Sequence, residues 1–156
     1  MTKKSSEHHN AKRLARLAAV QGLYRIEMTQ HAANDVIGDF RTHPPQIETE
    51  QGEKETLQEM DQELFGEIVA GVTQNTASLD EMIAGALDAK VSAGRIEVLL
   101  RAILRAGAYE LHHHGKIPAG IIINDYVDVA QAFFGAKEPG LVNAVLDRLA
   151  KGLRAT

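Results

Sequence analysis

The chain has 156 residues, of which 44% are hydrophobic, and this length and composition are typical of one globular domain. It contains no cysteine, no apolar signal region and no run of about 18 apolar residues, which excludes disulfides and thiolate metal sites and predicts a cytoplasmic protein without a membrane span. The net charge of −4 is unevenly distributed, because residues 1–25 carry +5 and the remainder carries −9.

The N-terminal segment, residues 1–10, is polar and has no periodicity, so we expect a flexible basic arm before a single helical domain over residues 11–156. Asn10 is suited to cap the helix that follows. Lys12, Arg13 and Arg16 fall within roughly a 100° arc of that helix, since each residue advances the helical wheel by about 100°. Side chains of this kind bind phosphates without reading base identity. The alternative is ordinary solubilising charge.

The rest of the chain is dominated by apolar residues at helical spacing, and no segment alternates as a half-buried strand does. Residues 42–56 contain Pro44, Pro45, Gly52 and several acidic residues, which predicts an acidic loop. Ser78 and Glu81 form a capping-box pattern. Ser92 is suited to cap the following helix. The sequence therefore predicts an all-α fold of about seven helices, over about 11–29, 35–40, 57–74, 78–87, 92–112, 121–134 and 139–153.

Two groups of residues raise the possibility of catalysis or metal binding. Asp125 and Asp128 lie at i, i+3 beside Asn124, but a catalytic pair needs a cleft and a perturbed pKa, so we expect a solvated or helix-capping face. Residues 112–114 are three consecutive histidines, whose side chains point about 100° apart on a helix. No short nucleophile or phosphate-loop motif is present. We therefore expect no enzyme, cofactor or metal, and a metal-dependent or acid/base enzyme is the less favoured alternative.

Five stretches resemble the NusB family, in the family's order along the chain. Residues 11–24 look like an arginine-rich opening followed by A-x-x-A-L-x-A-L-Y packing, and residues 101–111 are close to R-A-I-L-R-L-A-x-Y-E-L. Residues 71–80 are similar to G-V-x-x-N-x-x-x-L-D, residues 117–125 to I-P and I-N-E, and residues 142–147 to V-N-G-V-L-D. Together these stretches cover nearly the whole chain.

The resemblance implies an all-α fold of two packed helical sub-bundles and a non-enzymatic role in transcription antitermination. Family members bind the boxA element of ribosomal-RNA leader transcripts together with the ribosomal protein NusE, within the RNA polymerase antitermination complex. They are monomers or homodimers. A NusB-like RNA-binding domain acting in ribosomal-RNA maturation, as at the head of certain rRNA cytosine methyltransferases, is the runner-up interpretation.

The resemblance also assigns roles to individual residues. It implies that Lys12, Arg13 and Arg16 contact RNA, that Arg105 and Phe134 lie on the same RNA surface, and that Tyr24 helps to bind NusE. The chain departs from the family pattern at positions where the family often carries a basic residue, an acid, and a lysine with an aromatic residue: Leu14, Leu100 and residues 139–141.

Overall fold

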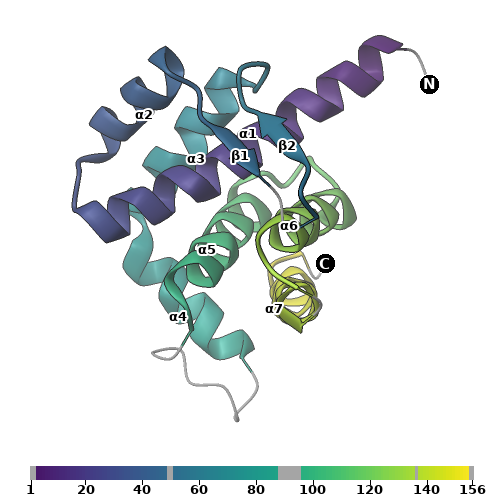
Figure 1. The fold of residues 1–156 in the computed structure, drawn as a ribbon. Helices are drawn as coiled ribbons and strands as arrows, with labels where there is room; N and C mark the ends of the chain where they lie inside the picture. Colours follow the sequence, from purple (N-terminus) through teal and green to yellow (C-terminus); the bar gives the residue numbers. More distant parts are fainter. Residues whose placement is uncertain (1–2, 49–50, 88–95, 136, 155–156) are drawn as a thin grey trace.

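The computed structural model describes residues 3–48, 51–87, 96–135 and 137–154. The described residues form seven α-helices and one two-stranded antiparallel hairpin (Figure 1). In chain order the elements are α1 (Lys3–Thr29), α2 (Ala33–Thr42), β1 (Gln46–Glu48), β2 (Lys54–Thr56), α3 (Gln62–Gln74), α4 (Thr76–Ala86), α5 (Val98–His113), α6 (Ala119–Phe133) and α7 (Lys137–Leu153).

The helices form two packed groups, as the family resemblance implies. Helices α1, α2 and α3 pack on one another, and α4, α5, α6 and α7 form the second group (Figure 1). Helix α5 contacts both α1 and α3 and so joins the two groups. The predicted all-α class is confirmed. No helix of the described residues is long and apolar enough to cross a bilayer.

Helix α1 is the central element of the fold. Its residues Leu14, Leu17 and Val20 are buried, as are the alanines between them, because the helix is enclosed by α2, α3, α5 and α6. The predicted start of this helix is wrong, since α1 begins at Lys3 and Asn10 lies inside it. Figure 1 shows this N-terminal part of the helix projecting beyond the rest of the molecule. The division into a basic arm and one domain stays a prediction.

Helix α3 begins five residues later than its apolar pattern predicts. The carboxylate of Asp61 accepts a hydrogen bond from the backbone N–H of Leu64 at 3.0 Å, which is a helix N-cap. Leu57 is buried, but it lies before the helix. The predicted cap at Ser78 is also wrong, because α4 already begins at Thr76. The expected cap at Ser92 lies outside the described residues.

The expected loop over residues 42–56 contains a short hairpin. Strand β1 pairs with β2 in a register that places Gln46 opposite Thr56 and Glu48 opposite Lys54. Gly52 has a φ of 82° in the connection, a conformation that favours glycine. The Gln51 amide donates to the carbonyl of Gln131 at 3.1 Å, which ties the hairpin to the end of α6. Strands of three residues are too short to be recognised from alternation.

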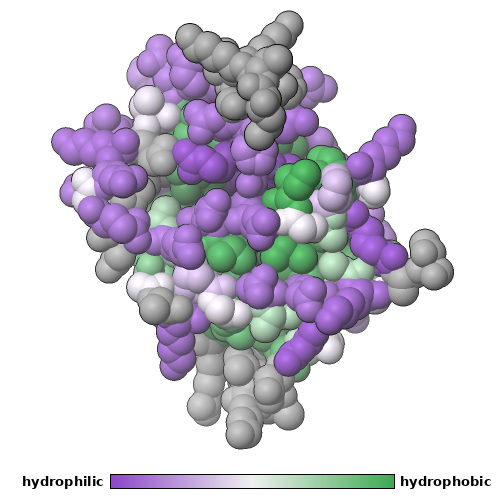
Figure 2. Space-filling view, turned by 90° about the vertical axis from the view of Figure 1, so that its right-hand side faces the viewer, coloured by the Kyte–Doolittle hydropathy of each residue, from purple (hydrophilic) through white to green (hydrophobic). Residues whose placement is uncertain are grey.

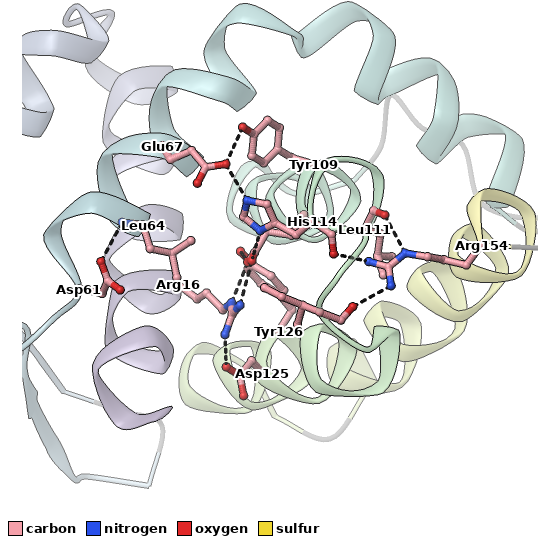
Figure 3. A network of polar contacts seen from close by, with 12 residues as sticks. Arg16, Asp61, Leu64, Glu67, Tyr109, Leu111, His114, Asp125, Tyr126 and Arg154 are labelled. Atoms are coloured by element: carbon pink, nitrogen blue, oxygen red, sulfur yellow. Dashed lines mark hydrogen bonds and ion pairs between the residues drawn. The ribbon is translucent and has the colours of Figure 1, made fainter. Parts of the chain in front are cut away.

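The turn between α5 and α6 is held from the far end of the chain. The guanidinium of Arg154 donates to the carbonyls of Leu111, His114 and Ile117 at distances from 2.7 to 3.0 Å. These carbonyls follow or end α5, where a helix leaves acceptors without intrahelical donors. Arg154 therefore joins the end of α7 to the α5–α6 turn (Figure 3).

Candidate nucleic-acid interface

Arg16, one of the three predicted RNA-binding residues of α1, is a core residue. It is 1% exposed, and its guanidinium donates to both carboxylate oxygens of Glu110 on α5, at 2.7 and 2.9 Å, and to Asp125 on α6 at 2.7 Å. Figure 3 shows Arg16 of α1 and Asp125 of α6 pointing toward each other. Arg16 is too deep to contact RNA in this structure, and we assign it a structural role.

Glu110 is the centre of this buried network. Besides Arg16, it accepts hydrogen bonds from the hydroxyl of Tyr126 at 2.6 Å and from His114 Nδ1 at 2.9 Å. Burial raises the pKa of Glu110, but the hydrogen bonds from Arg16, His114 and Tyr126 together outweigh it and lower the pKa to about 2. The carboxylate is therefore ionised at neutral pH although it is completely buried.

His114 extends the network from Glu110 to α3. Its Nε2 lies 2.6 Å from a carboxylate oxygen of Glu67, and the Tyr109 hydroxyl donates to the same oxygen at 3.0 Å. Both ring nitrogens of His114 thus face carboxylates, and an imidazolium can donate to both. The hydrogen bond with Glu110 raises the pKa of His114, burial lowers it, and Glu67 raises it further, so that the net pKa lies above 6.5.

This arrangement predicts that folding stability falls as pH rises above 6.5. The folded state keeps the His114 proton to a higher pH than the unfolded state does. The stabilisation from this proton is therefore complete below pH 6.5 and is lost as the pH rises through the raised pKa of the folded state. One such proton adds a slope of at most about 1.4 kcal/mol per pH unit. Urea unfolding between pH 6 and 8 should show a shallower slope in His114→Gln than in the native chain. Equal slopes in the two proteins would contradict this prediction. The control is His31→Gln, which replaces an exposed histidine and should leave the slope unchanged.

Lys12 and Arg13 are partly exposed, but their side chains have different neighbours. Lys12 lines a pocket toward α3 with Asp61, Glu63 and Glu67. Arg13 donates to the Asn10 side chain at 3.4 Å and lies close enough to Asp128 of α6 to affect its pKa. The helical wheel predicts that the three basic residues share one solvent-facing surface. In the structure they do not. Two of them border acidic neighbours, and the third is buried.

The other predicted site residues lie elsewhere on the fold. Arg105 has a 13% exposed side chain, binds both oxygens of Asp80 at 2.7 and 2.8 Å, and contacts Glu27 at 2.9 Å. Glu27 lies 14 residues beyond Arg13 on α1, which is about 21 Å along the helix axis at 1.5 Å per residue. Arg105, which binds Glu27, is therefore far from Arg13. Tyr24 is partly buried on the C-terminal half of α1, and Phe134, also partly buried, follows the last residue of α6.

The residues considered for catalysis have other partners. Asp125 is 3% exposed and bonded to Arg16, so the expected solvated face is wrong for it, whereas Asp128 is exposed. His113 stacks on the Tyr109 ring, and His114 is taken up by two carboxylates. Within the described part of the chain, no group of three or more suitable side chains is placed to hold a metal ion.

Comparison with known proteins establishes the family. The sequence model of the NusB family matches residues 13–151. The chain belongs to the NusB family. It is 44% identical over 146 residues to the transcription antitermination protein NusB of Nitrobacter hamburgensis, covering 94% of this chain and 89% of that protein. It is 41% identical over 152 residues to the NusB protein of Rhodopseudomonas palustris, covering 97% and 88% of the two chains.

Solved structures agree on the NusB fold. A structure of T. maritima NusB superposes with a TM-score of 0.70 at 24% identity, over 89% of each chain. A chain in the "Crystal Structure of a Plectonemic RNA Supercoil" superposes with a TM-score of 0.73 at 21% identity, over 92% of this chain and 96% of that one. Family membership confirms the prediction that this is a transcription antitermination protein of the NusB type. The NusB family is not a family of enzymes.

The buried polar network of this NusB family member was missed by sequence reasoning. Its signal was present, because Arg16 lies in an otherwise apolar stretch of α1, and Glu110 lies in an otherwise apolar stretch of α5. A charged residue is almost never fully buried unless it is paired. Two opposite charges in two buried stretches therefore indicate a buried ion pair, although the sequence does not show which residues pair.

Proposed function

We propose that this NusB family member binds boxA-type RNA of ribosomal-RNA leader transcripts together with the ribosomal protein NusE, and acts with RNA polymerase in the cytoplasm. The observation that carries the proposal is the position of Lys12 and Arg13. Both are partly exposed on α1, toward its N-terminal end, which projects from the body of the molecule (Figure 1). Arginine and lysine side chains of this kind bind phosphate oxygens without reading base identity.

The proposed RNA surface extends from α1 to the end of α6. Phe134 is partly exposed there and is suited to stack on an unpaired base, which is worth about 1–3 kcal/mol. Figure 2 shows the face turned toward the right-hand side of Figure 1, where hydrophilic side chains predominate and smaller hydrophobic areas lie between them. We leave Arg16 and Arg105 out of this surface, because carboxylates already bind both guanidinium groups.

The test is the salt dependence of RNA binding. Lys12→Ala/Arg13→Ala should weaken binding of a single-stranded boxA-type RNA and flatten the log–log salt slope by about 0.7 for each phosphate that is no longer neutralised, or about 1.4 for two phosphates. The control is Arg25→Ala/Lys151→Ala, which removes the same charge from residues in the surface ion pairs with Asp39 and Asp147. Unchanged affinity and slope in a folded Lys12→Ala/Arg13→Ala protein would refute this surface.

The role of the protein partner is tested in the same titration. Added NusE should raise the affinity for RNA, and RNA should raise the affinity for NusE by the same factor, because the coupling is reciprocal. Tyr24→Ala should reduce the effect of NusE while leaving the affinity for RNA alone unchanged. Equal RNA affinity with and without NusE would contradict the proposed role of NusE as a partner in RNA binding.

A further inference from the structure

His9 lies one helical turn before the basic residues of α1, on the part of the helix that projects from the molecule (Figure 1). It precedes Lys12 by three residues and Arg13 by four, so its side chain neighbours both on the helix surface. At about 100° per residue, the direction of His9 lies between those of Lys12 and Arg13. The match to the NusB family begins only at Arg13, so family membership assigns no role to His9.

A carboxylate of the core network holds the ring of His9 in place. His9 Nε2 lies 3.5 Å from one oxygen of Asp125 on α6, and the other oxygen of Asp125 accepts from Arg16 at 2.7 Å. Asp125 is buried, so its carboxylate does not turn toward solvent without losing Arg16. The His9 side chain itself is 56% exposed, which leaves the ring open to a ligand. His9 is therefore an accessible side chain on a fixed anchor.

A protonated histidine with this anchor has a second donor for a ligand. An imidazolium carries an N–H group on each ring nitrogen, and its contact with Asp125 is then an ion pair. With Nε2 beside Asp125, Nδ1 is the donor for another anion. We propose that protonated His9 binds a backbone phosphate of RNA through Nδ1, between the phosphates bound by Lys12 and Arg13. This inference rests on the proposed function and adds a binding residue to it.

The proposal makes RNA affinity depend on pH. Histidine is the side chain whose charge ordinarily changes between about pH 5 and 8. The charged side chains that face His9, from α6 and from α1 itself, are Asp125, Asp128, Lys12, Arg13 and Arg16. Arg16 already neutralises the carboxylate nearest to the ring. Loss of the His9 proton therefore removes one positive charge from the RNA surface, and RNA affinity should fall as the pH rises.

Salt titrations of RNA binding at about pH 5.5 and about pH 8 test the proposal with His9→Gln, which keeps a polar side chain. At the lower pH, His9→Gln should bind the same boxA-type RNA about two- to fivefold more weakly, the usual effect of one unit charge at contact distance in water. It should also flatten the log–log salt slope by up to about 0.7. At the higher pH, the variant and the native chain should bind alike. The control is His31→Gln, which removes an exposed histidine beyond the other end of α1 and should bind like the native chain at both pH values.

A permanent charge at the same position gives the opposite expected result. His9→Lys should bind RNA more tightly than the native chain at about pH 8, because lysine stays protonated there. His31→Lys adds the same charge elsewhere and should not tighten binding. Equal binding by His9→Gln and the native chain at about pH 5.5, or the same changes in the His31 variants, overturns the proposal. If Lys12→Ala/Arg13→Ala weakens binding while His9→Gln does not, this inference fails and the proposed function stands. If no variant changes binding, both fail.

Discussion

Arg16→Met is expected to lower the free energy of unfolding by about 3–5 kcal/mol, which is the usual cost of removing one partner from a buried ion pair. The substitution would remove the guanidinium that binds the carboxylates of Glu110 and Asp125, and these residues are 0% and 3% exposed. Urea unfolding followed by circular dichroism measures the change. Arg13→Met is the matched control and should cost less than about 0.5 kcal/mol, because its side chain is partly exposed.

A compensated variant keeps this prediction testable if Arg16→Met does not fold. Arg16→Met/Glu110→Gln/Asp125→Asn removes all three charges, and replacement of a whole buried ionic group by neutral residues is often tolerated. The triple variant should therefore be more stable than Arg16→Met alone. A single variant that unfolds like the native chain would contradict the structural role of Arg16. Arg16 would then be returned to the candidates for RNA contact.

Gly71→Ala is expected to cost about 1–3 kcal/mol, although alanine is the better helix former by about 1 kcal/mol. A Cβ atom at Gly71 would lie 2.3 Å from two atoms of the Tyr109 ring and 2.6 Å from its hydroxyl oxygen. The ring has little freedom to move away, since it stacks on His113 at a centroid distance of 4.4 Å and its hydroxyl binds Glu67. The substitution should therefore disturb the α3–α5 contact.

The control for Gly71→Ala has the opposite expected sign. Gly38 lies in the middle of α2, and a Cβ atom there would meet nothing within 4 Å. Gly38→Ala should raise the free energy of unfolding by up to about 1 kcal/mol through helix propensity alone. Thermal unfolding curves of the two variants thus distinguish a glycine that allows two helices to approach closely, at Gly71, from a glycine without a steric function, at Gly38. Stabilisation by both substitutions would show that Tyr109 yields freely.

Periodicity predicted the helices well, because apolar spacing reports which face of a helix is buried. It predicted helix starts poorly, since these depend on a single side-chain bond such as the one from Leu64 N–H to Asp61. Family resemblance identified the class of protein. Neither source located Arg16, because a helical wheel gives the direction of a side chain relative to its own helix and does not show which neighbouring helix covers it.

The ion pairs of Arg16 also have a consequence for the way this protein is made. Arg16 is separated from Glu110 by 94 residues and from Asp125 by 109 residues along the chain. At about 5–20 residues per second, a ribosome completes Asp125 roughly 5–20 s after Arg16. During that interval the charge of Arg16 has no internal partner, and the apolar sides of α1 that α5 and α6 will cover stay open to water. We therefore expect the nascent first helix to expose apolar surface of the kind that chaperones bind until α5 and α6 have been made.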